Sequence, residues 1–360
     1  MPELVRLADC SFTYRNGREP ILQDLNITLK RGDRILLAGK SGSGKSTLLA
    51  LLAGLVPDYM PGKIQGFAEY AALTRALVMQ NPEAQIVTPS VFEEAAFALE
   101  NKAVEPAEIE VRVNTVLIAA GLMEKRDRHP LTLSGGECQR VSLAVALAQK
   151  ADMLFMDEPL SYLDEKSSRS LVELLKKEAL DTTAVIVEHR LELFSSFCNR
   201  YFKIENKKLV ECGLEDLLRE HCVYRAGWER GGLAMGAVSG PPVLSVRNLR
   251  HAFGTHQVLK DVSFDVHAGE IVVLMGESGS GKTTILNMIT KTIAARRGTV
   301  LIEGGDISSM SKKSLYAKCL VVPQNPEHMF IADTVSKEVL CSGEQAQDYL
   351  ARFEIGRAHV

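Results

Sequence analysis

The chain has 360 residues, of which 46% are hydrophobic and 24% charged, with a formal net charge of −3. This composition is typical of a globular protein of roughly two to three domains, and the slightly acidic balance excludes the basic footprint of a nucleic-acid-binding protein. No apolar stretch reaches the ~18 residues of a membrane-spanning helix, and we expect no signal peptide because no basic segment with an apolar core opens the chain. The seven cysteines form no C-x-x-C pair, which favours reduced thiols in a cytosolic protein.

The first predicted element is a strand over residues 4–14, where the sequence LVRLADCSFTY alternates apolar and polar residues up to Tyr14. An aromatic side chain about 25 residues before a phosphate-binding loop can return to stack on a purine base. Tyr14 is therefore a candidate base contact, and a tyrosine in the core is the alternative.

Residues 39–47 read GKSGSGKST and fit the phosphate-binding pattern G-x-x-x-x-G-K-[ST]. They follow an apolar run at residues 34–38 and precede an apolar helical stretch, so strand, loop and helix come in the order that this loop requires. Backbone N–H groups can curl round a phosphate where side chains are absent, and the new helix directs its positive end at the same anion. A glycine-rich turn before an ordinary helix is the alternative. The candidate nucleotide ligands are Gly39, Ser41, Gly42, Gly44, Lys45, Ser46 and Thr47.

Two residues of this loop have separate expected tasks. Lys45 can neutralise the terminal phosphates, and Ser46 can bind the Mg²⁺ that accompanies them. The loop therefore predicts ATP or a related nucleotide together with Mg²⁺.

Residues 76–101 predict an apolar strand that ends at Gln80, a break at Asn81-Pro82 and a helix with Glu93 and Glu94 near its start. An amide at the end of a core strand beside the phosphate loop could reach a bound metal or the attacking water. A turn that only ends the strand is the alternative. Residues 103–130, which are charged and helical in period, predict a helical subdomain.

Residues 131–159 contain a second helix start. Ser134 and Glu137 fit the S-x-x-E capping box before an apolar run, and Gly135 and Gly136 leave the first N–H groups of the helix accessible. Helix starts of this kind bind anions. The sequence therefore predicts that Ser134, Gly135 and Gly136 contact a phosphate.

Two carboxylates follow the apolar run MLFM, residues 153–156, which predicts a buried parallel strand. Asp157 and Glu158 then lie at the carboxyl end of that strand, which faces the ligand crevice of an open α/β sheet. There Asp157 could hold Mg²⁺ and Glu158 could orient water. His189 follows another apolar strand, AVIV, and is a candidate contact to the γ-phosphate. The alternatives are solvated acids and a structural histidine.

The arrangement recurs in the second half of the chain. Residues 276–284 read GESGSGKTT after an apolar run at residues 271–275, and Phe253 and Gln324 stand where the first copy has Tyr14 and Gln80. This repeat indicates a duplicated domain, since solenoid units repeat every ~20 to 50 residues. The corresponding candidates are Phe253, Gly276, Gly279, Gly281, Lys282, Thr283, Thr284 and Gln324, with Thr283 and Gln324 also as Mg²⁺ ligands.

Together these motifs closely resemble the ATP-binding-cassette (ABC) family of ATPases. Residues 39–46 match its Walker A motif, 133–137 (LSGGE) its signature, 153–158 its Walker B motif and 161–164 (SYLD) its D-loop. The resemblance implies an α/β P-loop NTPase fold in tandem, with a RecA-like parallel sheet, an antiparallel β subdomain and a helical subdomain that carries the signature. It also implies two domains paired head to tail, so that each ATP lies between one Walker A motif and the partner's signature.

The family's site residues carry over to matching positions of this sequence. Its catalytic residues correspond to Glu158, to Gln80 as the Q-loop glutamine and to His189 as the switch histidine. Its Mg²⁺ ligands correspond to Ser46, Gln80 and Asp157. The resemblance thus implies ATP hydrolysis, with ATP and Mg²⁺ as cofactors.

Within the family, the pattern of residues 80–101 looks most like the ATPases of energy-coupling-factor (ECF) importers of vitamins and metal ions. That resemblance implies a transmembrane coupling subunit and a membrane substrate-binding subunit as partners, and no nucleic acid. It also implies a cytoplasmic protein that is peripheral on the inner face of the cell membrane.

Two other functions remain open. A soluble tandem ABC ATPase acting in translation or DNA repair would share every nucleotide motif, but we would expect it to carry a long charged linker or inserted zinc cysteines. A protein that only senses ATP or serves as a scaffold would be expected to lack Glu158, which is present.

The predicted domains are residues 1–225, a complete nucleotide-binding domain; 226–242, a Gly/Pro-rich linker; 243–353, the N-terminal part of a second, truncated domain; and 354–360, a tail that is not native, with a natural helical tail as the alternative. A second signature is expected beyond Val360, and the final EIGRAHV resembles a translated sequencing adapter. We therefore expect complete ATP sites only between the first domains of two chains or with a separate ATPase.

Overall fold

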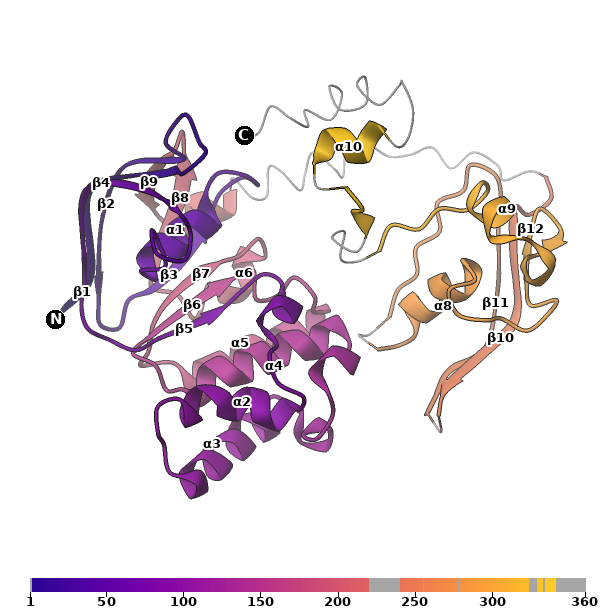
Figure 1. Cartoon of the computed structure of the whole chain (residues 1–360), viewed down its shortest axis with the longest axis horizontal. Helices are drawn as coiled ribbons and strands as arrows, with labels where there is room; N and C mark the ends of the chain where they lie inside the picture. Colours follow the sequence, from indigo (N-terminus) through magenta and orange to yellow (C-terminus); the bar gives the residue numbers. More distant parts are fainter. Residues whose placement is uncertain are drawn as a thin grey trace. The chain divides into compact units, whose positions relative to one another are not determined.

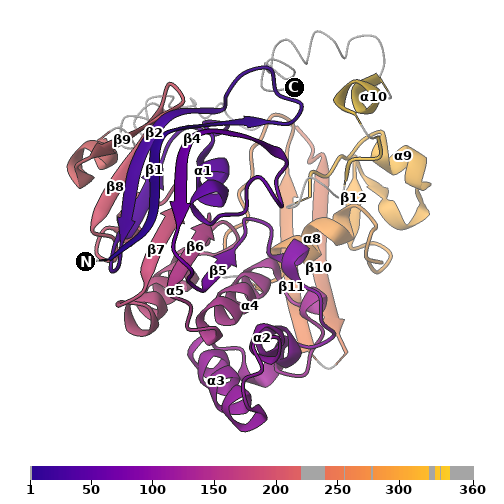
Figure 2. The same ribbon diagram turned by 60° about the vertical axis from the view of Figure 1, so that its left-hand side comes forward.

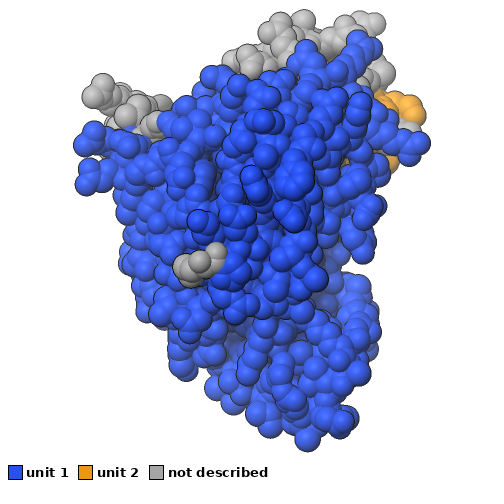
Figure 3. Space-filling model, turned by 90° about the vertical axis from the view of Figure 1, so that its left-hand side faces the viewer, with its two compact units in different colours: residues 1–230, 356–360 blue, residues 231–355 orange. Residues whose placement is uncertain are grey.

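The computed structural model describes residues 2–219, 240–254, 256–276, 279–323, 329–332 and 334–340. The chain divides into two compact units, residues 1–230 with 356–360 and residues 231–355, which are blue and orange in Figure 3. Most of the predicted linker at residues 226–242 lies outside the described residues, as does the whole predicted tail at residues 354–360.

The first unit contains a sheet of six strands: β3 (Arg34–Ala38), β5 (Arg75–Val78), β6 (Met153–Asp157), β7 (Thr183–Val187), β8 (Arg200–Glu205) and β9 (Lys208–Cys212). Their order is β5-β6-β7-β3-β8-β9, and all neighbours are parallel except β8 and β9. Every residue of β6 and β7 is buried, as expected for central strands of a parallel sheet that is covered on both faces.

An antiparallel sheet forms a second layer of this unit. It consists of β1 (Glu3–Tyr14), β2 (Leu22–Lys30) and β4 (Gly62–Tyr70), in the order β2-β1-β4. Helix α1 (Lys45–Leu52) lies between the two sheets (Figure 1). Seven of its eight residues are buried, because one core holds side chains from both sheets, such as Phe12 of β1 and Phe155 of β6. A helix between two apolar layers needs no polar face.

Helices cover the other face of the parallel sheet. A second core joins Met156 and Ile186 of the sheet to α4 (Gly135–Ala148), α5 (Glu165–Glu178) and α6 (Leu191–Phe194). Helices α2 (Val91–Glu100) and α3 (Pro106–Ala119) pack on α4 in a third core and form the predicted helical subdomain (Figure 2). The short helical turn η1 (Pro82–Gln85) lies between β5 and α2, and η2 (Met123–Lys125) and η3 (Pro130–Thr132) lie between α3 and α4.

The second unit contains a four-stranded antiparallel sheet in its described residues. Its strands are β10 (Leu244–Phe253), β11 (His256–Val266), β12 (Val300–Ile302) and β13 (Gly305–Asp306), in the order β11-β10-β12-β13. Helix α8 (Lys282–Ile289) shares a core with this sheet through Ile285 and Met288. The other elements are η4 (Ile307–Ser309), α9 (Lys312–Tyr316) and α10 (Val335–Leu340). Within the described ranges of both units, no helix combines the length and hydrophobicity needed to cross a bilayer.

The apolar run before the second phosphate loop is not a strand, unlike its counterpart β3. Residues 271–276 have no regular structure, and Ile271, Val273 and Met275 are 77%, 73% and 88% exposed. Residues 319–323, the counterpart of β5, likewise form no strand. In the first unit β3 pairs with β7 and β8, and β5 with β6, whereas the described residues of the second unit show only antiparallel pairs. A strand needs neighbours for its backbone hydrogen bonds, so an apolar run alone does not specify one.

A buried carboxylate holds the segment after Gln80 in the first unit. Glu94 of α2 accepts hydrogen bonds at Oε2 from Val87 N at 3.0 Å, Thr88 N at 2.9 Å and the Thr88 hydroxyl at 2.7 Å. The second unit repeats this contact, since Glu338 of α10 accepts from the backbone N–H groups of Ile331 and Ala332 at 2.9 and 2.6 Å. The internal repeat therefore extends beyond the phosphate loops to this helix start.

Candidate nucleotide-binding site

The first phosphate loop turns between the end of β3 and the start of α1. Gly39, Gly42 and Gly44 have φ angles of 152°, 75° and 96°, which side-chain-bearing residues rarely adopt. A Cβ atom at Gly39 would lie 2.8 Å from Ser43 Oγ, and one at Gly44 would lie 3.1 Å from Leu22 Cδ2. The loop conformation therefore requires glycine at both ends of the motif. Ser41, Gly42 and Ser46 are exposed at its surface.

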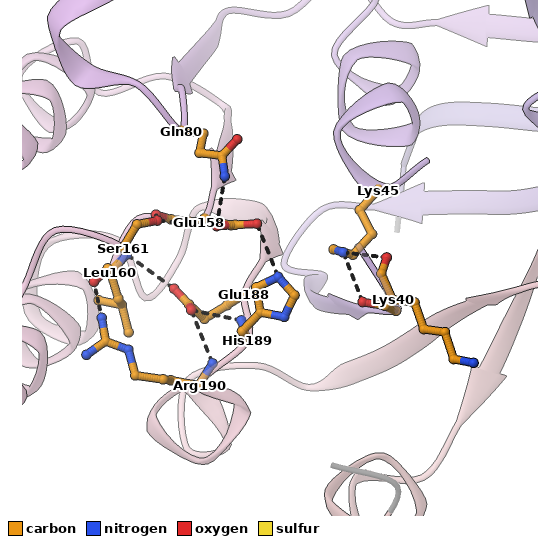
Figure 4. A network of polar contacts seen from close by, with 10 residues as sticks. Lys40, Lys45, Gln80, Glu158, Leu160, Ser161, Glu188, His189 and Arg190 are labelled. Atoms are coloured by element: carbon orange, nitrogen blue, oxygen red, sulfur yellow. Dashed lines mark hydrogen bonds and ion pairs between the residues drawn. The ribbon is translucent and has the colours of Figure 1, made fainter. Parts of the chain in front are cut away.

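Lys45 crosses this loop from the first turn of α1. Its ammonium group donates to the carbonyl oxygens of Gly39 at 2.9 Å and Lys40 at 3.0 Å (Figure 4). Burial lowers the pKa of Lys45, and the carboxylates of Glu158 and Asp157 act against that change. Because both carboxylates influence Lys45, the phosphate loop and the end of β6 form one electrostatic site.

Asp157 at the end of β6 lies beside the same loop. The carboxylate of Asp157 is buried; burial raises its pKa, and the Ser46 hydroxyl acts against that change. Its Oδ1 atom is buried with no hydrogen-bond partner among the described residues. An unpartnered buried carboxylate oxygen is costly, and a cation would remove that cost. Asp157 and Ser46 therefore fit Mg²⁺, which takes carboxylate and hydroxyl oxygens together with water.

Glu158 lies where the segments after three neighbouring strands meet. Its Oε2 accepts a hydrogen bond from Gln80 Nε2 at 3.0 Å, and its Oε1 is 3.2 Å from His189 Nε2 (Figure 4). The hydrogen bond with His189 is the main cause of a lowered pKa at Glu158, and the same bond raises the pKa of His189. Glu158 is thus ionised near neutral pH. The structure brings together the three residues that the sequence singled out for catalysis.

Tyr14 at the end of β1 reaches the phosphate-loop helix. Its hydroxyl forms a 2.7 Å hydrogen bond with Thr47 Oγ1, and its ring lies edge-on to Phe12, with centroids 5.0 Å apart. A surface cavity of about 550 Å³ opens beside the ring; its lining residues are Thr13, Tyr14, Arg15, Gly17, Pro57, Pro61, Gly62 and Lys63. The antiparallel sheet therefore carries Tyr14 back to the loop, as the base-contact hypothesis requires.

The signature segment begins α4 in the helical subdomain. The predicted capping box between Ser134 and Glu137 is confirmed, with Ser134 N donating to Glu137 Oε2 at 2.9 Å. A Cβ atom on Gly135 would lie 3.1 Å from the Tyr162 ring, so the start of α4 lies against the segment that follows Glu158. Ser134, Gly135 and Gly136 thus belong to the helical subdomain, whereas the phosphate loop lies between β3 and α1.

The second phosphate loop has the same backbone geometry in its described residues. Gly276, Gly279 and Gly281 have φ angles of 155°, 81° and 93°, and Lys282 Nζ donates to Gly276 O at 2.7 Å. Thr283 and Thr284 follow in α8. Phe253, the counterpart of Tyr14, is 56% exposed and lies edge-on to His251. The predicted ligand Gln324 lies outside the described residues.

Glu188 and Arg190, which flank His189, join this site without having been predicted. Glu188 is 3% exposed and bonds to the loop after Glu158, and Arg190 bonds to the same loop. The sequence shows only that Glu188 directly follows the apolar strand β7, and this position does not tell whether its side chain is buried.

The family comparison agrees with this geometry. The sequence model of the ABC transporter family matches residues 22–161 and 259–359, which together make up more than half of the chain. The chain belongs to the ABC transporter family. It is therefore an ATP-binding-cassette ATPase, as the motifs predict.

Two relatives align with almost the whole of this ABC ATPase. A protein of Methanosarcina mazei, described as a putative ABC transporter ATP-binding protein, is 30% identical over 374 residues, which cover 97% of this chain and 75% of the relative. YkoD of Bacillus subtilis, described as a putative HMP/thiamine import ATP-binding protein, is 29% identical over 413 residues, which cover 99% of this chain and 75% of the relative.

Solved structures share the fold of this ABC ATPase. The ATP-binding cassette MJ0796, solved as a dimer in a post-hydrolysis state with ADP and Pi, is 27% identical; the match covers 59% of this chain and 99% of that chain, with a TM-score of 0.51. The structure of cbiO1 from Clostridium perfringens, part of the transporter complex cbiONQ, is 24% identical; the match covers 64% of this chain and 96% of that chain, with a TM-score of 0.52. This likeness concerns the fold alone. The predicted α/β P-loop fold, with a parallel sheet and an antiparallel subdomain, is confirmed.

Proposed function

We propose that this ABC ATPase is the ATP-hydrolysing subunit of a membrane importer of the ECF type, for a vitamin or a metal ion. The observation that carries the hydrolytic part is the meeting of Gln80, Glu158 and His189 beside Lys45 and Asp157. These side chains come from the ends of different elements, and together they supply the charge, base and orienting groups that phosphoryl transfer to water needs.

Phosphate binding falls to residues 39–47 and α1. The loop N–H groups and the helix N-terminus would face the β- and γ-phosphates, and Lys45 would exchange the carbonyl oxygens of Gly39 and Lys40 for phosphate oxygens. Ser46 and Asp157 would hold Mg²⁺, with Gln80 as a further ligand, and the ion would neutralise charge on the phosphates. Tyr14 would contact the base. In the second unit Lys282 would contact the phosphates, Thr283 would bind Mg²⁺ and Phe253 would contact the base.

Water activation falls to Glu158. As an ionised carboxylate it can accept a proton from the attacking water, and its hydrogen bonds to Gln80 and His189 fix its direction. His189 would then place a hydrogen-bond donor where charge develops on the γ-phosphate. The signature at Ser134, Gly135 and Gly136 would close the site from a partner domain in a head-to-tail pair.

The transport part of the proposal has separate support. YkoD, whose name describes HMP/thiamine import, aligns with 99% of this chain, so the likeness extends over both units. The proposed partners are a transmembrane coupling subunit and a membrane substrate-binding subunit, which would hold the chain at the inner face of the membrane. Residues 226–242 would connect two nucleotide-binding domains.

Glu158→Gln tests the hydrolytic part. The amide keeps the shape of the side chain and its contacts with ATP but cannot accept the proton, so we expect the Kd for ATP to stay within about two-fold and kcat to fall by about 100-fold or more. Glu165→Gln is the matched control, because Glu165 is an exposed carboxylate at the start of α5. A Glu158→Gln enzyme that turns over ATP at the wild-type rate would remove Glu158 from the mechanism.

Co-purification tests the importer part. The chain is expressed together with membrane proteins encoded beside it, extracted in mild detergent and purified through a tag on the chain. The proposal expects stoichiometric membrane subunits that raise its ATPase rate. Recovery with ribosomes or DNA instead would favour a soluble ABC ATPase acting in translation or DNA repair.

A further inference from the structure

A buried carboxylate joins the loop of His189 to the loop that follows Glu158. Glu188 Oε1 accepts hydrogen bonds from the backbone N–H groups of His189 at 2.8 Å and Arg190 at 3.1 Å. Its Oε2 accepts one from Leu160 N at 3.2 Å. Figure 4 shows this carboxylate turned toward Leu160 and away from Lys45. Glu188 therefore bridges two loops that carry different residues of the proposed site.

Arg190 connects the same two loops as a hydrogen-bond donor, whereas Glu188 does so as an acceptor. Its guanidinium group donates to the carbonyl oxygens of Leu160 and of Leu163, the latter at 3.2 Å. These two carbonyls flank Ser161 and Tyr162 in the segment that matches the D-loop. A guanidinium suits this task because its planar fork can reach two acceptors at once.

The backbone of Glu158 needs such support. Its φ of 47° is one that residues other than glycine rarely adopt, and a conformation of this kind persists only where its neighbours over-determine it. Glu158 N donates to Val187 O at 2.9 Å, and the Ser161 hydroxyl donates to Glu158 O at 2.6 Å. Val187 directly precedes Glu188, and Ser161 directly follows Leu160. Glu188 thus links the two segments that hold Glu158 in place.

We propose that Glu188 and Arg190 form a clasp that sets the position of the Glu158 carboxylate relative to the His189 ring. Both are positioning residues, because they bond to backbone groups behind the site rather than to the reacting phosphate. The inference rests on the proposed roles of Glu158 and His189. It adds that the hydrogen bonds between residues 188–190 and residues 160–163 maintain the 3.2 Å contact between those side chains.

Glu188→Gln tests the clasp from one side. The substitution turns one accepting oxygen into an NH₂ group that faces a backbone N–H donor, so one of the two loops is released. We expect kcat to fall by about 10- to 100-fold, because a misplacement of about 1 Å is enough for such a loss, with the Kd for ATP within about two-fold. The matched control is Asp152→Asn. Asp152 is also a carboxylate that accepts backbone and hydroxyl hydrogen bonds, from Thr74 N and the Thr74 hydroxyl, but it lies directly before the start of β6, at the end of the strand opposite to Glu158. A Glu188→Gln kcat equal to that of the control overturns the proposal.

A double-mutant cycle separates positioning from general stability. If Glu188 acts through the geometry of His189 and Glu158, adding Glu188→Gln to His189→Ala should lower kcat by less than about two-fold further. Independent losses that multiply would mean that Glu188 only stabilises the fold, and would overturn the clasp. Arg190→Lys, which keeps the charge but not the planar fork, applies the same cycle to the other clasp residue if Glu188→Gln does not fold.

Wild-type activity distinguishes this inference from the proposed function. All rates are measured on the full chain beside the wild type. A wild-type chain that hydrolyses no ATP contradicts the proposed function itself. An active wild type whose Glu188→Gln and Arg190→Lys variants keep the full kcat contradicts the clasp alone.

Discussion

Carboxylates near the two ends of β6 differ in what surrounds them. Asp152, directly before the strand, accepts hydrogen bonds from the Thr74 hydroxyl at 2.8 Å and Thr74 N at 3.1 Å, and these lower its pKa. At the other end, burial raises the pKa of Asp157, and one of its carboxylate oxygens has no hydrogen-bond partner among the described residues. A satisfied carboxylate stabilises the fold, whereas an unsatisfied one is available to a cation.

The lowered pKa of Asp152 predicts a pH-dependent stability. Because its pKa is lower in the folded than in the unfolded chain, its hydrogen bonds stabilise the fold above the unfolded pKa and are lost as pH falls through the folded one. We expect Thr74→Val to lower the free energy of unfolding by about 1 kcal/mol at pH 7. The difference from wild type should shrink below about pH 4.

Urea unfolding at a series of pH values checks this expectation. Thr115→Val is the control, because the Thr115 hydroxyl donates to the carbonyl of Val111, which does not titrate. An effect of Thr74→Val that is constant across the series would argue against a titrating partner.

The site residues that could be predicted from the sequence are those that directly follow a buried strand and belong to a recognisable motif. Gln80, Glu158 and His189 could be named because the ends of neighbouring parallel strands meet at one edge of the sheet. Glu188 and Arg190 could not, since a sequence does not tell whether a charged side chain after a strand turns outward or beneath the adjacent loop. That choice depends on the backbone groups of Leu160 and Leu163, which are far away in the chain.

At the scale of elements, α2 in the first unit and α10 in the second are each hydrogen-bonded to the segment that directly precedes the helix. Glu94 and Glu338 each accept two backbone N–H groups seven and six residues before themselves. Beside these bonds, Val87 and Ile331 are 67% and 96% exposed. Each of these two carboxylates therefore fixes a segment that presents an apolar side chain to the outside.

Glu94→Gln should weaken that connection. Hydrogen bonds to a charged acceptor contribute more than those to a neutral one, so we expect a loss of about 2 kcal/mol in the free energy of unfolding, with the Kd for ATP unchanged. Thermal and urea unfolding measure the loss, and Glu93→Gln, an exposed change in the same turn, is the control. Equal stabilities of the two variants would show that the Glu94 bonds contribute nothing beyond helix capping.

Elements were predictable to different degrees. The strand β1, the helical subdomain and the phosphate-loop helices follow from local pattern, and the structure contains them. Residues 271–275 have the same apolar pattern as β3 but form no strand. Parallel strands depend on partners that lie far along the chain, so local pattern cannot decide their pairing.

At the scale of the whole molecule, the signature and the phosphate loop lie on different parts of the first unit. A head-to-tail pair would bring the signature of one chain onto the ATP of another. Chains with Lys45→Ala should bind ATP poorly, and chains with Ser134→Trp should bind it but fail to close the partner's site. Each variant alone is expected to be inactive.

Mixing the two variants tests this pairing. In a mixed pair, the intact Lys45 of one chain meets the intact Ser134 of the other, so one of two sites is complete. We expect roughly a quarter of the wild-type ATPase rate, because about half of the pairs are mixed. A mixture as inactive as its components would contradict pairing between first units.

The exposed run before the second phosphate loop has a consequence for handling the protein. Residues 271–275 are uncharged, apolar and rich in β-branched side chains, and their backbone belongs to no sheet. Such segments are templates for strand addition between molecules, which leads to aggregation. We expect Val273→Lys to raise the concentration at which light scattering begins, and Val111→Lys, on the exposed face of α3, to change it less. Colloidal stability would then be set by five residues that take no part in hydrolysis.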